Sequence, residues 1–249
     1  MFSALSYALF KKCIIAIMTT LCGHRGSVNC LEIVEDTRSL QLLSGAEDKS
    51  IRFWDLRCNF KSQKCIGGCF DSSVTDLKLS YDNANLLFTS TETSLYVFDL
   101  RFESVLNRTP LHTFETIFDS VNSIALQQKQ DALTAIADDS GNICILNYCN
   151  NSCAQNLLGA HSSIISSVLF NRIRTNELVS GGYDCCCHLW DLETKSRKSS
   201  VNFSDLSSLS EDKGQVFNPP FVSSLHYIHN CSALAIGLGD GRVSNDHST

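Results

Sequence analysis

The sequence has no long basic run, and this absence limits what the chain can bind. Lysine and arginine together number 20 against 26 acidic residues, so the formal net charge is −6 and the pI is near 5.6. A surface that binds nucleic acid needs clustered positive charge to follow the phosphates. We therefore expect no nucleic acid among the direct partners.

Long apolar runs are also absent. Residues 2–18 come closest, but Lys11 and Lys12 interrupt them, and neither half reaches the roughly 18 apolar residues that span a bilayer. A signal peptide would carry its positive charge first and a small-residue cleavage site after the apolar run. Two other interpretations of residues 1–22 stay open: an edge strand packed on the domain, or a non-native start upstream of Met18.

The 13 cysteines contain no Cys-x-x-Cys pair and their number is odd, which argues against a disulfide framework. A reducing compartment, cytoplasm or nucleus, fits this pattern best.

Hydrophobic residues make up 43% and charged residues 18% of the 249, which is typical of a folded globular chain. Disordered, fibrous and multi-span membrane classes are therefore excluded.

An internal repeat is the strongest signal in the sequence. Residues 23–57 and 160–192 both run from a His through an alternating apolar strand, a second strand ending in Ser-Gly, an Asp turn and a third strand ending in Trp-Asp. Weaker copies lie at 74–101 and 121–147. The ends of the third strands recur at spacings of 44, 48 and 44, at Trp54, Phe98, Leu146 and Trp190. This period, without helix signals, predicts an all-β propeller.

From Gly23 to Val243 these motifs resemble the WD-repeat family, and an Asp stands six residues before each Trp. In that family the His, Ser, Asp and Trp of a complete copy form a buried hydrogen-bond chain. The resemblance assigns this structural role to His24, Ser44, Asp48, Trp54, His161, Ser180, Asp184 and Trp190. In the second copy, Phe70, Phe88 and Phe98 stand at the positions that we match to His, Ser and Trp, which predicts an apolar cluster instead.

A fifth copy begins near Phe221 and reaches a turn at Asp240, but only SNDHST follows Val243. The sequence therefore predicts four blades over 23–192 and a partial fifth over 216–249, in an incomplete ring. Between them, residues 193–215 are rich in serine and charge, which indicates a flexible surface insertion. A second interpretation of this segment is a phosphorylation or docking loop around Ser199, Ser200 or Ser208.

Two groups of residues invite a chemical interpretation. His24, Ser44 and Asp48 are the residue types of a hydrolase triad, but no Gly-x-Ser-x-Gly elbow exposes the serine, and the family resemblance explains all three. In Cys185-Cys186-Cys187-His188, neighbours on a strand alternate faces, so four metal ligands do not converge. We expect no enzyme activity, no cofactor and no metal.

The ending Trp54-Asp55-Leu56-Arg57 resembles a box carried by family members that are substrate receptors of cullin-4 ubiquitin ligases, in which the Arg meets the adaptor. Asp99 and Arg101 repeat a looser form one blade later. The competing interpretation is an exposed Arg that pairs locally with a carboxylate.

We predict a non-catalytic protein-interaction scaffold that acts as such a receptor. It would bind the adaptor and ubiquitination substrates in the cytoplasm or nucleus. The alternatives are a scaffold in an unrelated nuclear or cytoplasmic assembly, and a membrane-tethered or exported protein that depends on residues 1–22.

Overall fold

The computed structural model describes most of the chain from residue 20 to residue 246. The described ranges are 20–36, 39–56, 62–80, 85–101, 106–107, 109–115, 119–127, 133–150, 152–207, 218–228 and 233–246. The expectations for the N-terminal segment concern residues 1–22, and residues 1–19 lie outside the described ranges. No helix in the described ranges has the length and apolar character needed to cross a membrane.

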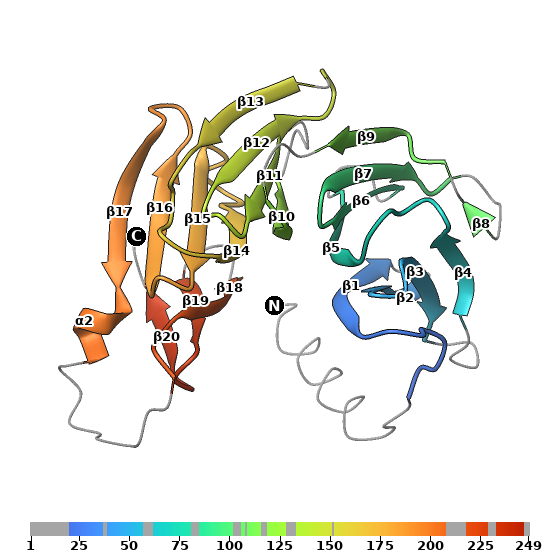
Figure 1. Ribbon diagram of the computed structural model, residues 1–249, viewed down its shortest axis with the longest axis horizontal. Coiled ribbons are helices and arrows are strands. Elements are labelled where there is room, and N and C mark those ends of the chain that lie inside the picture. Colours follow the sequence, from blue (N-terminus) through green and yellow to red (C-terminus); the bar gives the residue numbers. More distant parts are fainter. Residues whose placement is uncertain are drawn as a thin grey trace, which may run out of the picture.

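Five antiparallel sheets, here called blades 1 to 5 in chain order, are arranged in a ring (Figure 1). Each sheet begins with an inner strand and proceeds outward along the chain. In blade 1 the strands are β1 (Val28–Asp36), β2 (Ser39–Ala46), β3 (Ser50–Asp55) and β4 (Ser62–Gly67). In blade 2 they are β5 (Val74–Leu79), β6 (Leu86–Thr91), β7 (Ser94–Asp99) and β9 (His112–Glu115). A short β8 (Leu106–Asn107) pairs in parallel with β4 and extends blade 1.

The remaining blades follow the same plan. Blade 3 contains β10 (Val121–Leu126), β11 (Leu133–Asp138), β12 (Ile143–Asn147) and β13 (Ser152–Leu157). Blade 4 contains β14 (Ile165–Phe170), β15 (Glu177–Gly182), β16 (Cys186–Asp191) and β17 (Ser196–Asn202), followed by α2 (Phe203–Ser207). Blade 5 contains β18 (Val222–Ile228), β19 (Ala233–Leu238) and β20 (Val243–Asp246).

Two sequence predictions need correction. Blade 5 has a third strand, β20, where we expected the copy to stop, so the described residues form five blades rather than four and a fragment. Residues 196–202, predicted as part of a flexible insertion, instead pair along β16 as the outer strand β17. An outer strand needs only backbone bonds on one side, so its largely exposed, Ser- and Lys-rich composition is compatible with pairing.

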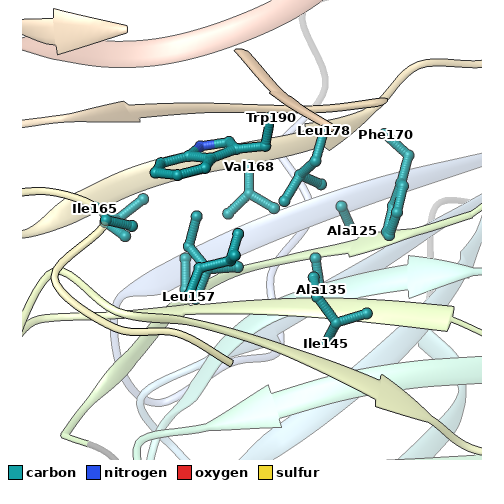
Figure 2. Close-up of a cluster of buried hydrophobic side chains, with 12 residues drawn as sticks. Ala125, Ala135, Ile145, Leu157, Ile165, Val168, Phe170, Leu178 and Trp190 are labelled. Atoms are coloured by element: carbon teal, nitrogen blue, oxygen red, sulfur yellow. The ribbon is translucent and has the colours of Figure 1, made fainter. Parts of the chain in front are cut away.

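The core consists of four apolar clusters, one between each pair of consecutive blades. Figure 2 shows the cluster between blades 3 and 4, where Val168 and Phe170 of β14 lie against the small side chains of Ala125 and Ala135. Small residues opposite large ones let the two sheets interdigitate. Strand alternation thus gives each blade two apolar faces, one for each neighbour.

Side-chain hydrogen bonds also join consecutive inner strands. In blades 1, 3 and 4, the second residue of the inner strand donates to the carbonyl of the first residue of the next inner strand. Three such bonds run from Asn29 Nδ2 to Val74 O (2.9 Å), from Asn122 Nδ2 to Ile165 O (3.4 Å) and from Ser166 Oγ to Val222 O (2.6 Å).

One face of blade 1 differs from its equivalents elsewhere. Strand register matches Val28, Leu31 and Ile33 of β1 with Ile165, Val168 and Phe170 of β14. The β14 residues are at most 5% exposed because they pack on blade 3, whereas the β1 residues are 49%, 58% and 49% exposed. At the other end, Val243 of blade 5 is 73% exposed. The first and last blades therefore each present apolar side chains that internal blades bury.

Candidate functional site

A hydrogen-bond chain crosses blade 1 from strand to turn. Trp54 Nε1 on β3 donates to Ser44 Oγ on β2 (2.8 Å), and Ser44 lies 2.7 Å from His24 Nε2. His24 Nδ1 lies 3.0 Å from the carboxylate of Asp48, in the turn before β3. Since the indole can only donate and the carboxylate can only accept, His24 carries its proton on Nδ1 and accepts from Ser44 on Nε2.

Blade 4 repeats the arrangement with deeper burial. Trp190 Nε1 donates to Ser180 Oγ, Ser180 contacts His161 Nε2, and His161 Nδ1 lies 2.9 Å from Asp184. Burial opposes ionisation of Asp184. The hydrogen bond and charge of His161, together with the backbone N–H groups of Ser162 and Cys186, outweigh it and lower the Asp184 pKa to about 2.

Blade 2 replaces the polar chain with aromatic rings, as the sequence predicts. Phe70 meets Tyr96 and Phe98 edge to face, at centroid distances of 5.2 and 5.7 Å. The match of Phe88 to the serine position is wrong: the register pairs Thr89 with Leu77 and Tyr96, which places Thr89 there. Thr89 Oγ1 donates to the Asp76 carbonyl.

The cysteine cluster of blade 4 has one unusual member, His188. Its ring stacks on His161 at 4.4 Å between centroids, and its Nδ1 is buried with no hydrogen-bond partner. Burial and then the neighbouring His161 lower the His188 pKa to about 4.

Atoms of His161, Asp184 and His188 lie within 4.8 Å of one another, as metal ligands could. Both nitrogens of His161 are engaged, however, with Asp184 and Ser180. A metal held by this trio would have to break the hydrogen-bond chain of blade 4, so the geometry favours a structural role.

The residues predicted to bind an adaptor lie at the ends of the third strands. Trp54 is buried, Asp55 and Leu56 are half-buried at the end of β3, and Arg57 lies outside the described residues. At the equivalent end of β7, Arg101 donates through its backbone N, Nε and Nη2 to Asp99. These bonds lower the Asp99 pKa to about 2. The Asp99 side chain is 7% exposed and that of Arg101 is 68% exposed.

A charged group in the centre of the ring was not predicted from the sequence. A cavity of about 510 Å³ is lined by the inner strands of all five blades. Lys78 Nζ lies 3.0 Å from Asp76 Oδ1, and Asp76 Oδ2 accepts from the backbone of Ile124 in the next blade. Burial raises the pKa of the nearby Glu32 carboxyl. This group could have been found in the sequence from its charged residues, which stand at inward positions of otherwise apolar strands.

Four-stranded blades with Trp–Ser–His–Asp chains are typical of one class of propeller. Comparison with known proteins matches the two segments of this chain that contain them. The family model "WD domain, G-beta repeat" matches residues 16–55 and 151–191, which include β1–β3 and β13–β16. Over these two segments the chain matches the WD-repeat family, and its sheets are arranged as the blades of an all-β propeller.

The chain is similar to "WD repeat-containing protein 53 homolog" of Dictyostelium discoideum, with 27% identity over 91% of this chain. It spans 64% of that relative's length. Shorter similarities link it to "Protein Atg16l2" of Mus musculus (28% identity; 51% of this chain, 20% of the relative). Another match is "CCR4-associated factor 4 homolog" of Vanderwaltozyma polyspora (26% identity; 43% and 17%).

Proposed function

We propose that the chain is a non-catalytic scaffold that binds other proteins. The burial of its serines carries this proposal. Ser44 and Ser180 are 3% and 0% exposed, and each hydroxyl is held between a Trp and a His of its own blade. A nucleophile must reach its substrate, so these Ser-His-Asp sets serve to hold the turns that display the rim loops.

The finer proposal is a substrate receptor of a cullin-4 ubiquitin ligase, acting in the cytoplasm or nucleus. Its adaptor surface would be the rim where β3 and β7 end, with Trp54, Asp55 and Arg57 in blade 1 and Asp99 and Arg101 in blade 2. Arg101 is exposed and pairs with Asp99 two residues away, which is the geometry of the competing interpretation. The proposal requires that the guanidinium, held in one direction by this buried carboxylate, also contacts the adaptor. An arginine held in this way loses less side-chain entropy on binding.

The free thiol state supports the proposed compartment, since every cysteine in the described residues is unpaired by disulfide. Fractionation of the native protein would test it. Recovery in a secreted or membrane fraction would contradict it.

Direct binding to a purified cullin-4 adaptor tests the receptor proposal. We expect the full chain to bind, and Arg57→Glu/Arg101→Glu to bind at least tenfold more weakly because it reverses both rim charges. Arg25→Glu is the matched control: Arg25 is exposed near the Asp48 turn, at the opposite ends of the strands, and should leave binding unchanged.

Affinity purification of the same variants from the protein's own cell type separates the alternatives. If the adaptor co-purifies with the native chain and is lost with the double variant, the receptor proposal is supported. If other proteins co-purify and ignore the two arginines, the chain is a scaffold of an unrelated assembly. If the adaptor is absent, the receptor proposal is wrong.

A further inference from the structure

Two thiols of blade 3 face each other across neighbouring strands. Cys144 on β12 and Cys153 on β13 have their Sγ atoms 3.7 Å apart. The register pairs Cys144 with Asn156 and Cys153 with Leu146, so the two cysteines are diagonal neighbours beside a bulge in the pairing. A disulfide has an S–S distance near 2.05 Å. Diagonal positions on paired strands lie about 7 to 8 Å apart, beyond the Cα separation of most disulfides, so closing the gap requires a shift of β13 as well as rotation of the two side chains.

The two thiols have opposite environments. Cys153 is exposed, on an outer strand whose other residues also face solvent for most of its length. Cys144 is 6% exposed and belongs to the apolar cluster between blades 2 and 3. Burial, with Cys153 as the next cause, raises the pKa of the Cys144 thiol. An oxidant arriving from solvent therefore meets Cys153 first, with Cys144 positioned behind it.

We propose that Cys144 and Cys153 are a thiol-oxidation site that forms a reversible disulfide when the protein meets a peroxide. The Cys153 thiolate attacks a peroxide oxygen, the O–O bond breaks, and the products are Cys153 sulfenic acid and hydroxide, which takes up the proton that Cys153 lost on ionising and becomes water. The Cys144 sulfur then attacks the Cys153 sulfur. The S–OH bond breaks, and the hydroxide takes the Cys144 proton and leaves as water. The two cysteines are oxidised and the peroxide is reduced to two waters.

β13 is free to accommodate the bond because of its place in the blade. As the last strand of its sheet it pairs with β12 alone, so it can shift without breaking a second ladder. The bond would tie this outer strand to a residue of the blade 2 interface. Oxidation by peroxide at this site would thus affect the packing between blades 2 and 3.

Peptide mapping of the full chain tests the proposal. The protein is treated with a few equivalents of hydrogen peroxide, its remaining thiols are alkylated, and it is digested with chymotrypsin. Cleavage after Tyr148 separates Cys144 from Cys149 and Cys153, whereas trypsin would leave all three on the peptide between Lys129 and Arg172. We expect a disulfide-linked pair of peptides that dithiothreitol separates.

Variants assign the bond. Cys149→Ser removes the exposed thiol in the same hairpin and should leave the linked pair intact. Cys144→Ser should abolish it and raise several-fold the yield of Cys153 sulfenic acid captured by dimedone. A bond between Cys149 and Cys153, or dimedone labelling of Cys153 that Cys144→Ser does not change, would overturn the proposal.

Discussion

His188 stacks on His161 in blade 4, with an angle of 26° between the rings, and blade 1 has Arg52 at the position of His188. His161 is the central member of a hydrogen-bond chain, whereas His188 only covers it. Blades 1 and 4, which both hold a complete hydrogen-bond chain, therefore differ in the residue that shields it.

This stack predicts a loss of stability in mild acid. The His188 pKa falls from 6.5 to about 4 on folding, so between these pH values the unfolded chain binds the proton more tightly. The contribution of His188 to the free energy of unfolding is therefore fully present above pH 6.5. It decreases as the pH drops toward 4, by up to about 3 kcal/mol. Urea midpoints at pH 7 and pH 5 measure it. The variant His188→Gln should lose less between the two pH values, and an equal loss would contradict the assignment.

Removal of the terminal carboxylate of a hydrogen-bond chain should destabilise its blade. In Asp184→Ala, the His161 Nδ1–H and the backbone N–H of Ser162 lose their acceptor. We expect a cost of about 1 to 3 kcal/mol in the free energy of unfolding, and a similar cost for Asp48→Ala. Thermal or urea unfolding checks both. Unchanged midpoints would show that the chains are dispensable.

Equivalent residues of β1 and β14 should respond differently to truncation. Phe170→Ala leaves a cavity between blades 3 and 4 and should cost about 3 to 5 kcal/mol. Ile33→Ala at the matching position of blade 1 removes a half-exposed side chain and should cost less than about 1 kcal/mol. Urea unfolding of both variants measures the difference. Equal costs would mean that the blade 1 face is covered in solution.

Two glycines with positive φ form another matched pair. A Cβ added to Gly141 would lie 2.3 Å from the His161 carbonyl oxygen, whereas one added to Gly241 would have open space around it. Both positions strain a non-glycine backbone by about 1 to 2 kcal/mol. We therefore expect Gly241→Ala to cost about that much, and Gly141→Ala to cost about 2 to 4 kcal/mol because blades 3 and 4 must also move apart. Melting temperatures rank them, and the reverse order would contradict the structure.

The sequence predicted most accurately where side chains of distinctive chemistry recur at fixed spacing. Trp54 and Trp190, with an Asp six residues before each, located two blades because few other structures need those residues together. It failed at Phe88, because a shift of one residue moves a side chain to the opposite face of a strand and only the pairing register distinguishes Phe88 from Thr89.

Strands without an apolar pattern were missed for a related reason. β17 and β20 are polar and largely held by backbone bonds to a neighbouring strand, which leave no trace in side-chain periodicity. The charged pair Asp76 and Lys78 also escaped notice, because the position of the ring axis depends on how five separate sheets pack.

The apolar clusters and hydrogen bonds between consecutive blades give the molecule the energetics of a linear array. In such an array, stability is the sum of the repeats and their nearest-neighbour contacts, and opening starts where a repeat has one neighbour instead of two. Among the described residues, blades 1 and 5 are those ends, with Leu31 and Val243 exposed. Backbone amides should therefore exchange with deuterium fastest in β1 and β20, and slowest in the inner strands of blades 2, 3 and 4.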